Sequence, residues 1–456
     1  MTVRFVVIGA GPAGVRAAST AARIGAKVTL VERDVVGGAA NLWDCVPSKA
    51  MIATGSLVAL ARRAAVLGLE PLSPRVDLGL LGDRVRSIAA KLAGSWTDQL
   101  TSQGVRMMRG SARLVGAHHV EVTDADGQVQ ALEADAMLLA TGSYPRVPEW
   151  AHVDGDRVLT TRQAYPPPTI PEHLVVVGSG VTGVEFVHMF RSLGSKVTLL
   201  VSRQQVLPQK DPEVAAALET DFLDSGVTLC KGARAVGVDV GPPGESIVVR
   251  CEDGRSVHGS HVLLAVGSIP ASAGLGAENA GVHVNDAGYV PVNHHCQSNV
   301  EHIYAAGDLS GRLPLASVAA SQGHKVAEHV MGQHTREHRH LDYDKAASAI
   351  FTEPEIADVG LAEAEAFALG RKIRVTKVPL ATNARALIDG DARGFVKIVS
   401  DPATGVVLGG SVVGAHAAEL ISVIALAVTA NLRVIDLAES LFVHPALAEA
   451  LAEAAE

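Results

Sequence analysis

One glycine fingerprint occurs twice in this chain of 456 residues, and it restricts the fold more than any other feature. The copies read FVVIGAGPAG (residues 5–14) and LVVVGSGVTG (residues 174–183). Each contains an apolar strand, then G-x-G-x-x-G, then a run that favours a helix, then a second apolar strand, VTLVE (28–32) or VTLLV (197–201). This βαβ context predicts two dinucleotide-binding units of the Rossmann type, and therefore an α/β fold.

Each glycine of the fingerprint has its own role. The first allows the tight turn, the second lets the backbone approach a pyrophosphate, and the third permits close packing of helix on strand. The unpaired N–H groups and the dipole at the helix start favour the phosphates. The expected nucleotide contacts are Gly9, Gly11, Pro12, Ala13 and Gly14 in the first unit, and Gly178, Gly180, Val181 and Gly183 in the second.

The two units differ at the end of their second strand. Glu32 ends that strand in the first unit and is followed by Arg33. Its carboxylate can accept hydrogen bonds from both ribose hydroxyls of an adenosine. The equivalent position in the second unit holds Val201, followed by Ser202 and Arg203. A carboxylate would repel a 2′-phosphate, whereas a hydroxyl and a guanidinium can bind one, so we expect NADPH to be used at least as well as NADH.

Proline and polar segments predict domain boundaries near residues 150, 270 and 335. Three prolines (166–168) precede the second unit, and the polar stretch 333–343 follows residue 330. Beyond it, apolar strands such as FVKIV (395–399) precede Ala-, Leu- and Glu-rich helices, a pattern typical of an α+β domain. We expect one nucleotide-binding domain from 1–150 and 271–335, another from 151–270, and a C-terminal domain from 336–456.

Charge and composition exclude several classes of protein. The net charge of −9 argues against a nucleic-acid partner, and no uncharged apolar stretch is long enough to predict a membrane span. The N-terminus begins a strand directly, which leaves no room for a signal peptide. Four cysteines without a CxxC pair fit a reducing cytoplasm. Histidine-rich patches at 294–295 and 334–340 each lack a second ligand cluster at the usual spacing, so no metal is expected.

The segment GGAANLWDCVPSK (37–49) resembles the flavoprotein disulfide reductases, the family of glutathione reductase and dihydrolipoamide dehydrogenase. Further matches extend along the chain: ATG (140–142), AVGSIP (265–270), IYAAGD (303–308), FTEPEIADVG (351–360) and HPALAE (444–449). The resemblance implies a homodimer with FAD in the first unit and NADPH or NADH in the second. To the FAD site it adds Gly38, Ala39, Lys49, Ala112, Thr141, Gly142, Asp308, Leu315 and Ala316, and to the nicotinamide site it adds Glu185 and Gly267.

The same resemblance implies the catalytic roles. Lys49 and Glu185 would form an ion pair beside flavin N5, where the lysine stabilises negative charge on reduced flavin. His444 and Glu449 match the family's acid–base dyad, in which the carboxylate orients the imidazole and raises its basicity. In the family this histidine reaches the flavin of the partner subunit.

The redox disulfide of the family cannot form in this chain, because its two cysteine positions hold Ala40 and Cys45. Cys45 is expected against the flavin, near a helix start whose dipole stabilises a thiolate. The missing cysteine is the one that would attack an external disulfide. With Trp43 and Asp44, this loop looks most like that of the dihydrolipoamide-dehydrogenase-like NAD(P)H:quinone reductases. We therefore expect hydride transfer from NAD(P)H to FAD and direct transfer to a quinone, and no dihydrolipoamide dehydrogenase activity.

Three other functions remain open. A soluble pyridine-nucleotide transhydrogenase also dispenses with the disulfide, although the retained Cys45 weighs against it. A single-cysteine thiol or peroxide reductase would cycle Cys45 through a sulfenic acid. A non-catalytic flavin-binding subunit or redox sensor is disfavoured by the complete nicotinamide fingerprint and by the Lys49 and Glu185 pair.

Overall fold

The chain folds into two compact units in the computed structural model, which describes residues 2–70, 72–242, 244–333 and 340–456. Unit 1 contains Met1–Ser48, Gly82–Arg146 and Gly267–Tyr343, and unit 2 contains Lys49–Leu81, Val147–Val266 and Asp344–Glu456. Each unit carries one of the two glycine loops. The segment 49–81 belongs to unit 2, because helix α2 (Val46–Arg62) continues from the first unit into the second.

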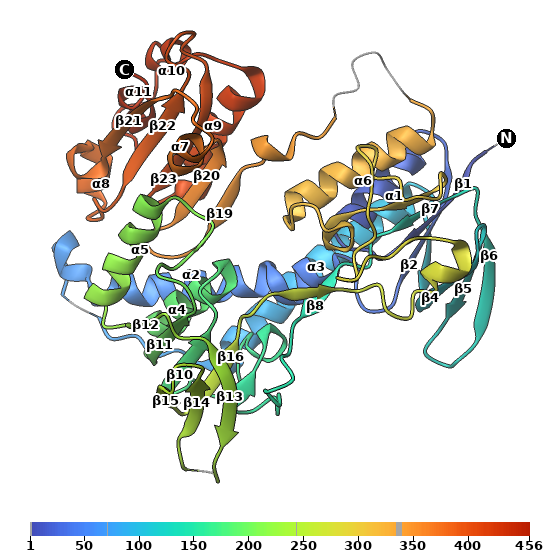
Figure 1. Ribbon diagram of the computed structural model, residues 1–456, viewed down its shortest axis with the longest axis horizontal. Coiled ribbons are helices and arrows are strands. Elements are labelled where there is room, and N and C mark those ends of the chain that lie inside the picture. Colours follow the sequence, from blue (N-terminus) through green and yellow to red (C-terminus); the bar gives the residue numbers. More distant parts are fainter. Residues whose placement is uncertain (1, 71, 243, 334–339) are drawn as a thin grey trace. The chain divides into compact units, whose positions relative to one another are not determined.

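Unit 1 is built on a parallel sheet with helices on one face and a small antiparallel sheet on the other (Figure 1). Helix α1 (Pro12–Arg23) follows the first glycine loop, and α6 (Ala316–Val330) lies beside it. The parallel sheet has the order β18 (Ile303–Ala305), β7 (Ala136–Leu139), β1 (Arg4–Ile8), β2 (Lys27–Glu32) and β3 (Arg106–Arg109). The other elements are α3 (Leu78–Ser102), the sheet of β4 (Ser111–Gly116), β5 (His119–Thr123) and β6 (Val129–Glu133), and the pair β8 (Ser143–Pro145) and β17 (Ser268–Pro270).

The alternation of β1 distributes its side chains to two hydrophobic cores. Phe5 and Val7 pack into the core shared with α1 and α6, whereas Val6 and Ile8 pack into the core shared with the antiparallel sheet. Successive residues of a strand point to opposite faces, so an uninterrupted apolar run is what a strand covered on both faces requires. The strand that leads into the first glycine loop is therefore held on both sides.

Unit 2 repeats this architecture around the second fingerprint. Helix α4 (Val181–Leu193) follows the second glycine loop, and α5 (Pro212–Asp224) begins at an Asp211 cap. The parallel sheet has the order β12 (Thr228–Lys231), β11 (Lys196–Val201), β10 (His173–Val177), β16 (His261–Leu264) and β9 (Val158–Leu159). A three-stranded antiparallel sheet of β13 (Ala235–Val240), β14 (Ile247–Cys251) and β15 (Ser256–Gly259) packs against it.

The C-terminal part of unit 2 is an antiparallel sheet with helices packed on it, as expected for an α+β domain. Its strands have the order β19 (Ser348–Ile350), β20 (Ile356–Gly360), β23 (Val407–Val413), β22 (Phe395–Ser400) and β21 (Arg374–Pro379). Its helices are α7 (Glu363–Ala368), α8 (Ala384–Ile388), α9 (Ala417–Ala430), α10 (Val434–Ala438) and α11 (Glu449–Glu453). The predicted class, two Rossmann-like domains with a C-terminal α+β domain, is confirmed. Within the described ranges, no helix has the length and apolar character of a membrane span.

Candidate active site

The first glycine loop, between β1 and α1, has the geometry of a pyrophosphate cradle. Gly9 has a φ of +100°, and a Cβ there would lie 2.3 Å from the carbonyl oxygen of Ala140. A Cβ on Gly14 would lie 1.8 Å from the carbonyl oxygen of Gly9. A Cβ on Gly11, the N-cap of α1, would meet nothing within 4 Å. Two glycines are thus required by backbone packing, and the third faces open space in front of the helix N-terminus, where phosphates are favoured.

Glu32 is fixed at the rim of this loop. One carboxylate oxygen accepts a hydrogen bond from Ala10 N at 2.7 Å, and the other accepts one from Asp34 N at 2.8 Å. Gly38, with a φ of +57°, brings its backbone against Gly11, because a Cβ on Gly38 would lie 2.9 Å from Gly11 Cα. Each carboxylate oxygen retains a second acceptor site, so Glu32 can still bind a ribose. This arrangement fits the adenosine half of FAD.

Apart from Lys49, which belongs to unit 2, the other residues expected at the FAD site lie in unit 1 with this loop. Thr141 Oγ1 donates to Ala271 O at 2.8 Å, and Ala271 N donates to Gly142 O at 2.9 Å, so the two segments are joined. Asp308, in the short turn Gly307–Ser310, accepts a hydrogen bond from Ser143 Oγ at 2.6 Å. The remaining positions are Arg33, exposed and paired with Asp34; Ala39 before a helical turn; Ala112 on β4; and Leu315 and Ala316, the N-cap and first residue of α6.

The second glycine loop repeats the first almost atom for atom. Gly178 has a φ of +112°, and its added Cβ would lie 2.2 Å from Ala265 O. A Cβ on Gly183 would lie 1.8 Å from Gly178 O, and one on Gly180 would meet nothing within 4 Å. Val181, the first residue of α4, is exposed beside the loop, and Gly267 has a φ of +96°. This loop has the shape that a second dinucleotide requires.

Val201 occupies the place in unit 2 that Glu32 occupies in unit 1. In both units an equivalent backbone hydrogen bond joins the glycine loop to the end of the strand. Gly178 N donates to Leu200 O in unit 2, and Gly9 N donates to Val31 O in unit 1. The Val201 side chain is fully buried, whereas Ser202 and Arg203 are exposed. The strand end therefore presents a hydroxyl and a guanidinium in place of a carboxylate.

The structure brings Lys49 and Glu185 together within unit 2. Lys49 Nζ lies 2.9 Å from Glu185 Oε2, and Glu185 Oε1 accepts a hydrogen bond from Phe351 N at 3.0 Å. The ammonium also lies 4.9 Å from the centre of the Phe351 ring. Only a tenth of the glutamate side chain is exposed, against a third of the lysine. The carboxylate is held at both oxygens, so the lysine carries the accessible charge of the pair.

Ala40 and Cys45 are one turn of a π-helix apart. Residues Ala40–Asp44 form that turn, and Cys45 N donates to Ala40 O at 3.2 Å, the i→i+5 bond of a π-helix. Cys45 is half-buried and directly precedes α2. The family's cysteine spacing thus corresponds to one π turn, which places the two positions next to each other and leaves a methyl group where the second sulfur would be.

His444 and Glu449 form the expected dyad. His444 Nδ1 lies 2.8 Å from Glu449 Oε1, while Glu449 Oε2 accepts from Ala446 N at 2.9 Å. These two hydrogen bonds, the backbone one first, lower the pKa of Glu449. An ionised carboxylate requires the proton on Nδ1, which leaves Nε2 to exchange a proton with a ligand. The imidazole is 73% exposed.

Three supporting residues were missed in the sequence. Ser143 orients Asp308 and directly follows the ATG match, which is the one signal that could have found it. Gln322 on α6 is buried and accepts a hydrogen bond from Gly307 N at 2.7 Å. Gly323 is required because a Cβ there would lie 2.0 Å from Ala13 O. The last two depend on the tertiary approach of α6 to α1, which no local pattern indicates.

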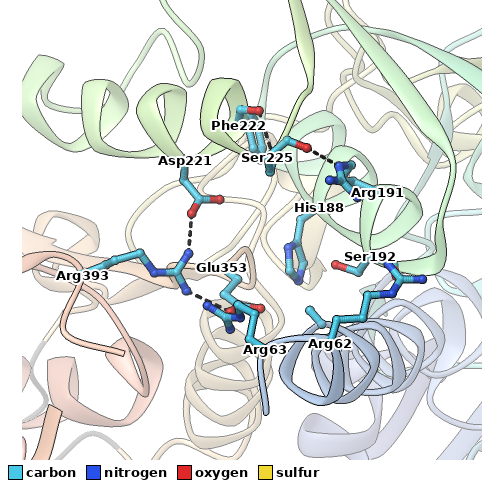
Figure 2. Close-up of a pocket in the computed structure, with 11 residues that line it drawn as sticks. Arg62, Arg63, His188, Arg191, Ser192, Asp221, Phe222, Ser225, Glu353 and Arg393 are labelled. Atoms are coloured by element: carbon cyan, nitrogen blue, oxygen red, sulfur yellow. Dashed lines mark hydrogen bonds and ion pairs between the residues drawn. The ribbon is translucent and has the colours of Figure 1, made fainter. Parts of the chain in front are cut away.

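A separate pocket of about 260 Å³ lies within unit 2 and is rich in arginine (Figure 2). Arg393 pairs with Asp221 and Glu353, and Arg63 also pairs with Glu353. Burial lowers the pKa of His188, which lies among these groups, to about 4. The pocket is lined by Ala59, Arg62, Arg63, His188, Arg191, Ser192, Asp221, Phe222, Ser225, Glu353 and Arg393.

This arginine pocket is distinct from the nucleotide site. It contacts α4 at His188, Arg191 and Ser192, about 10–15 Å along the helix from the glycine loop at its N-terminus. Its arginines have partners of their own, since Arg62 donates to the carbonyl of Ser192 and Arg191 to that of Ser225. The cations are thus engaged within the protein, and a phosphate would have to displace these partners.

Burial disfavours the thiolate form of the three cysteines other than Cys45. Burial raises the pKa of Cys230 and of Cys251, and it raises that of Cys296 to about 11. None of the four cysteines, which all lie in the described part of the chain, forms a disulfide. Cys45 is therefore the one sulfur placed among the residues that match the redox site.

Two dinucleotide loops of matching geometry and an ion-paired lysine between them in sequence define a two-nucleotide oxidoreductase. The Pyridine nucleotide-disulphide oxidoreductase family matches residues 3–323, and the dimerisation domain of that family matches residues 346–455. The chain therefore belongs to this family of flavoprotein disulfide reductases, whose cofactors are FAD and NAD(P)H.

Relatives cover the whole chain. An NAD(P)H dehydrogenase (quinone) of Mycobacterium tuberculosis is 42% identical over 100% of this chain and 94% of its own length. A dihydrolipoyl dehydrogenase of Haloferax volcanii is 36% identical over 99% of this chain and 95% of its own. The crystal structure of LpdA from M. tuberculosis matches with a TM-score of 0.94 and 41% identity, over 100% of this chain and 99% of that one. RclA, a flavoprotein disulfide reductase of Escherichia coli, matches at 0.87 and 25% identity, over 100% and 99%.

Proposed function

We propose that this protein is a homodimeric, FAD-dependent NAD(P)H:quinone oxidoreductase that transfers electrons without a redox disulfide. The observation that carries the proposal is Ala40, one π turn from Cys45. Without a second sulfur there, dithiol exchange with lipoamide or glutathione has no route. The quinone dehydrogenase from M. tuberculosis, similar along the whole chain, supports a quinone as the acceptor class.

When bound, FAD would supply the two-electron chemistry between nicotinamide and acceptor that no side chain offers. The glycine loop of unit 1, with Glu32 and Asp308, would hold it. The loop of unit 2, with Ser202 and Arg203, would hold the nicotinamide nucleotide. The Lys49 ammonium, fixed by Glu185 at 2.9 Å, would stabilise negative charge on the reduced ring system.

His444 would supply a proton on the acceptor side. A quinone becomes a hydroquinone by gaining two electrons and two protons, so an acid near its oxygen lowers the barrier. Glu449 holds Nδ1 and leaves Nε2 for this transfer. The exposed imidazole lies in the part of the chain that matches the dimerisation domain, which supports a role at the flavin of the partner subunit. Four widely spaced cysteines without a CxxC pair support a reducing compartment such as the cytoplasm.

A steady-state panel of acceptors tests the proposal. Purified holoenzyme is assayed anaerobically with NADPH or NADH against menadione, a benzoquinone, lipoamide, glutathione disulfide, hydrogen peroxide and thio-NADP⁺. We expect turnover with the quinones and none with the disulfides. Faster turnover with thio-NADP⁺ would favour a transhydrogenase, and faster turnover with peroxide would favour chemistry at Cys45. No oxidation of either nucleotide by any acceptor would indicate a non-catalytic flavoprotein.

A further inference from the structure

The fold brings together the two histidine patches that are far apart in the sequence. His294, His295 and His340 each offer a ring nitrogen, and these three atoms all lie within 4.8 Å of one another. The ring centroids of His294 and His295 are 4.0 Å apart, and those of His294 and His340 are 4.3 Å apart. No metal was expected because neither patch has a second ligand cluster at the usual spacing in the sequence. The fold places His340 beside His294 and His295, so that reason does not hold.

A defined turn of unit 1 holds two of these rings. Asn293 Oδ1 accepts hydrogen bonds from His295 N at 2.8 Å and from Gln297 N at 3.0 Å, which closes the turn. The buried Cys296 follows His295 and anchors the turn in the core. The backbone that presents the two imidazoles is thus fixed by its own hydrogen bonds.

A fourth histidine supports the cluster from α6. The ring of His329 stacks on that of His295, with centroids 4.3 Å apart. His329 Nδ1 in turn lies 2.7 Å from Tyr304 Oη. The stack restrains the direction of the His295 ring.

The donor set selects a class of ion. Three imidazole nitrogens suit Zn²⁺, Ni²⁺ or Cu²⁺, whereas Mg²⁺ and Ca²⁺ require oxygen ligands. Metal–nitrogen distances of about 2.0–2.1 Å limit two ligand atoms on one ion to a separation of about 4.2 Å. The side chains of His294 and His340 are exposed, so small rotations of their rings can close the remaining gap.

We propose that His294, His295 and His340 form a binding site for a divalent transition metal, separate from both nucleotide sites. The ion would join the turn at 293–297 to the chain at His340, two segments far apart in the sequence. Three protein ligands leave one position of a tetrahedral ion for water. The site does not depend on the proposed electron acceptor, since none of its residues belongs to the nucleotide loops, the Lys49 pair or the His444 dyad.

Metal titration of the FAD-loaded enzyme, purified without a histidine tag and stripped with a chelator, tests the site. Zn²⁺ and Cu²⁺ binding is measured by calorimetry for the wild type and for His294→Gln and His340→Gln. Both substituted side chains are exposed, so folding should be unaffected, and FAD content and NADPH oxidation serve as checks. His118→Gln is the matched control, because His118 is also exposed and stacks on His302 with centroids 4.0 Å apart.

We expect the wild type and the control each to bind one metal ion tightly per subunit. In each of the two site variants the dissociation constant of that ion should be at least about 100-fold larger. Electron paramagnetic resonance of bound Cu²⁺ should show three nitrogen ligands in the wild type and fewer in the variants. The proposal is overturned if the wild type binds no tight equivalent, if the control loses it as well, or if only His340→Gln weakens it. That last result would assign binding to the histidine-rich stretch alone.

Discussion

At the scale of single residues, the end of β11 governs the choice of nucleotide. Val201→Glu places a carboxylate where Glu32 stands in unit 1, and it should repel the 2′-phosphate of NADPH. We expect the NADPH-to-NADH ratio of kcat/KM to fall by about tenfold, measured by steady-state kinetics with menadione. Val201→Gln is the control, since it has similar size without the charge. An equal shift in both variants would mean that packing, not charge, sets the preference.

His444 should affect one half-reaction only. His444→Ala removes the proton donor on the acceptor side, and we expect quinone turnover to fall by about 100-fold while flavin reduction by NADPH stays near the wild-type rate. Stopped-flow measurements separate the two half-reactions. Glu449→Gln keeps the imidazole but weakens its orientation, so its loss should be smaller. Equal losses of rate in both half-reactions would contradict the role of His444 as proton donor to the quinone.

His188 should make stability depend on pH. Its pKa is about 4 in the folded protein and near 6.5 in the unfolded chain, because burial disfavours the cation. Below pH 6.5 the unfolded chain binds a proton that the folded protein does not, so stability falls as pH drops from about 6.5 to about 4. Between pH 7.5 and 5.0 the wild type should lose about 2 kcal/mol more free energy of unfolding than His188→Gln. Urea unfolding at both pH values measures this, and identical losses would contradict it.

At the scale of elements, the π turn 40–44 should be able to restore the family's disulfide. Ala40→Cys places a second sulfur one turn from Cys45, and a pair in that position can close if the Cβ vectors converge. The oxidised, denatured variant should then show three free thiols, against four in the wild type, in a thiol assay. Ala39→Cys is the matched control and should show five. Five thiols in Ala40→Cys would mean that the turn does not permit the bond.

The same element sets the electron capacity. With FAD as its redox centre, the wild type should be fully reduced by two electrons per FAD in an anaerobic dithionite titration, and Ala40→Cys should take four. If the wild type takes four electrons per FAD, it must contain a second redox centre, and direct transfer from flavin to quinone would be contradicted.

Much of this architecture was predictable because it is local. The fingerprints, the strand ends at Glu32 and Val201, and the alternating strands of the C-terminal domain all lie in contiguous stretches. The Lys49–Glu185 pair was expected only from the family resemblance, since its members meet through tertiary packing. The π turn at Ala40 was not foreseen, because the sequence alone does not separate it from an α turn. The histidine cluster was missed for the same tertiary reason as Gln322.

At the scale of the whole molecule, the C-terminal domain should mediate self-association. Leu441 is fully exposed and Val443 is three-quarters exposed, in the part of the chain that matches the family's dimerisation domain. The match to the dimerisation domain, and not exposure alone, is the reason to expect these two side chains at an interface. Leu441→Glu with Val443→Glu should convert the dimer to a monomer in sedimentation velocity. Leu69→Glu with Leu72→Glu, also exposed but outside that domain, is the control and should remain dimeric.

The two glycine loops exclude substitution at the same position. In both, a Cβ on the third glycine would lie 1.8 Å from the carbonyl oxygen of the first. Any other side chain would clash there, so a substitution of this glycine would displace the backbone of its own loop. The strand ends differ, with Glu32 in unit 1 and Val201 in unit 2. Engineering of nucleotide preference should therefore leave both loops untouched and act on the strand ends.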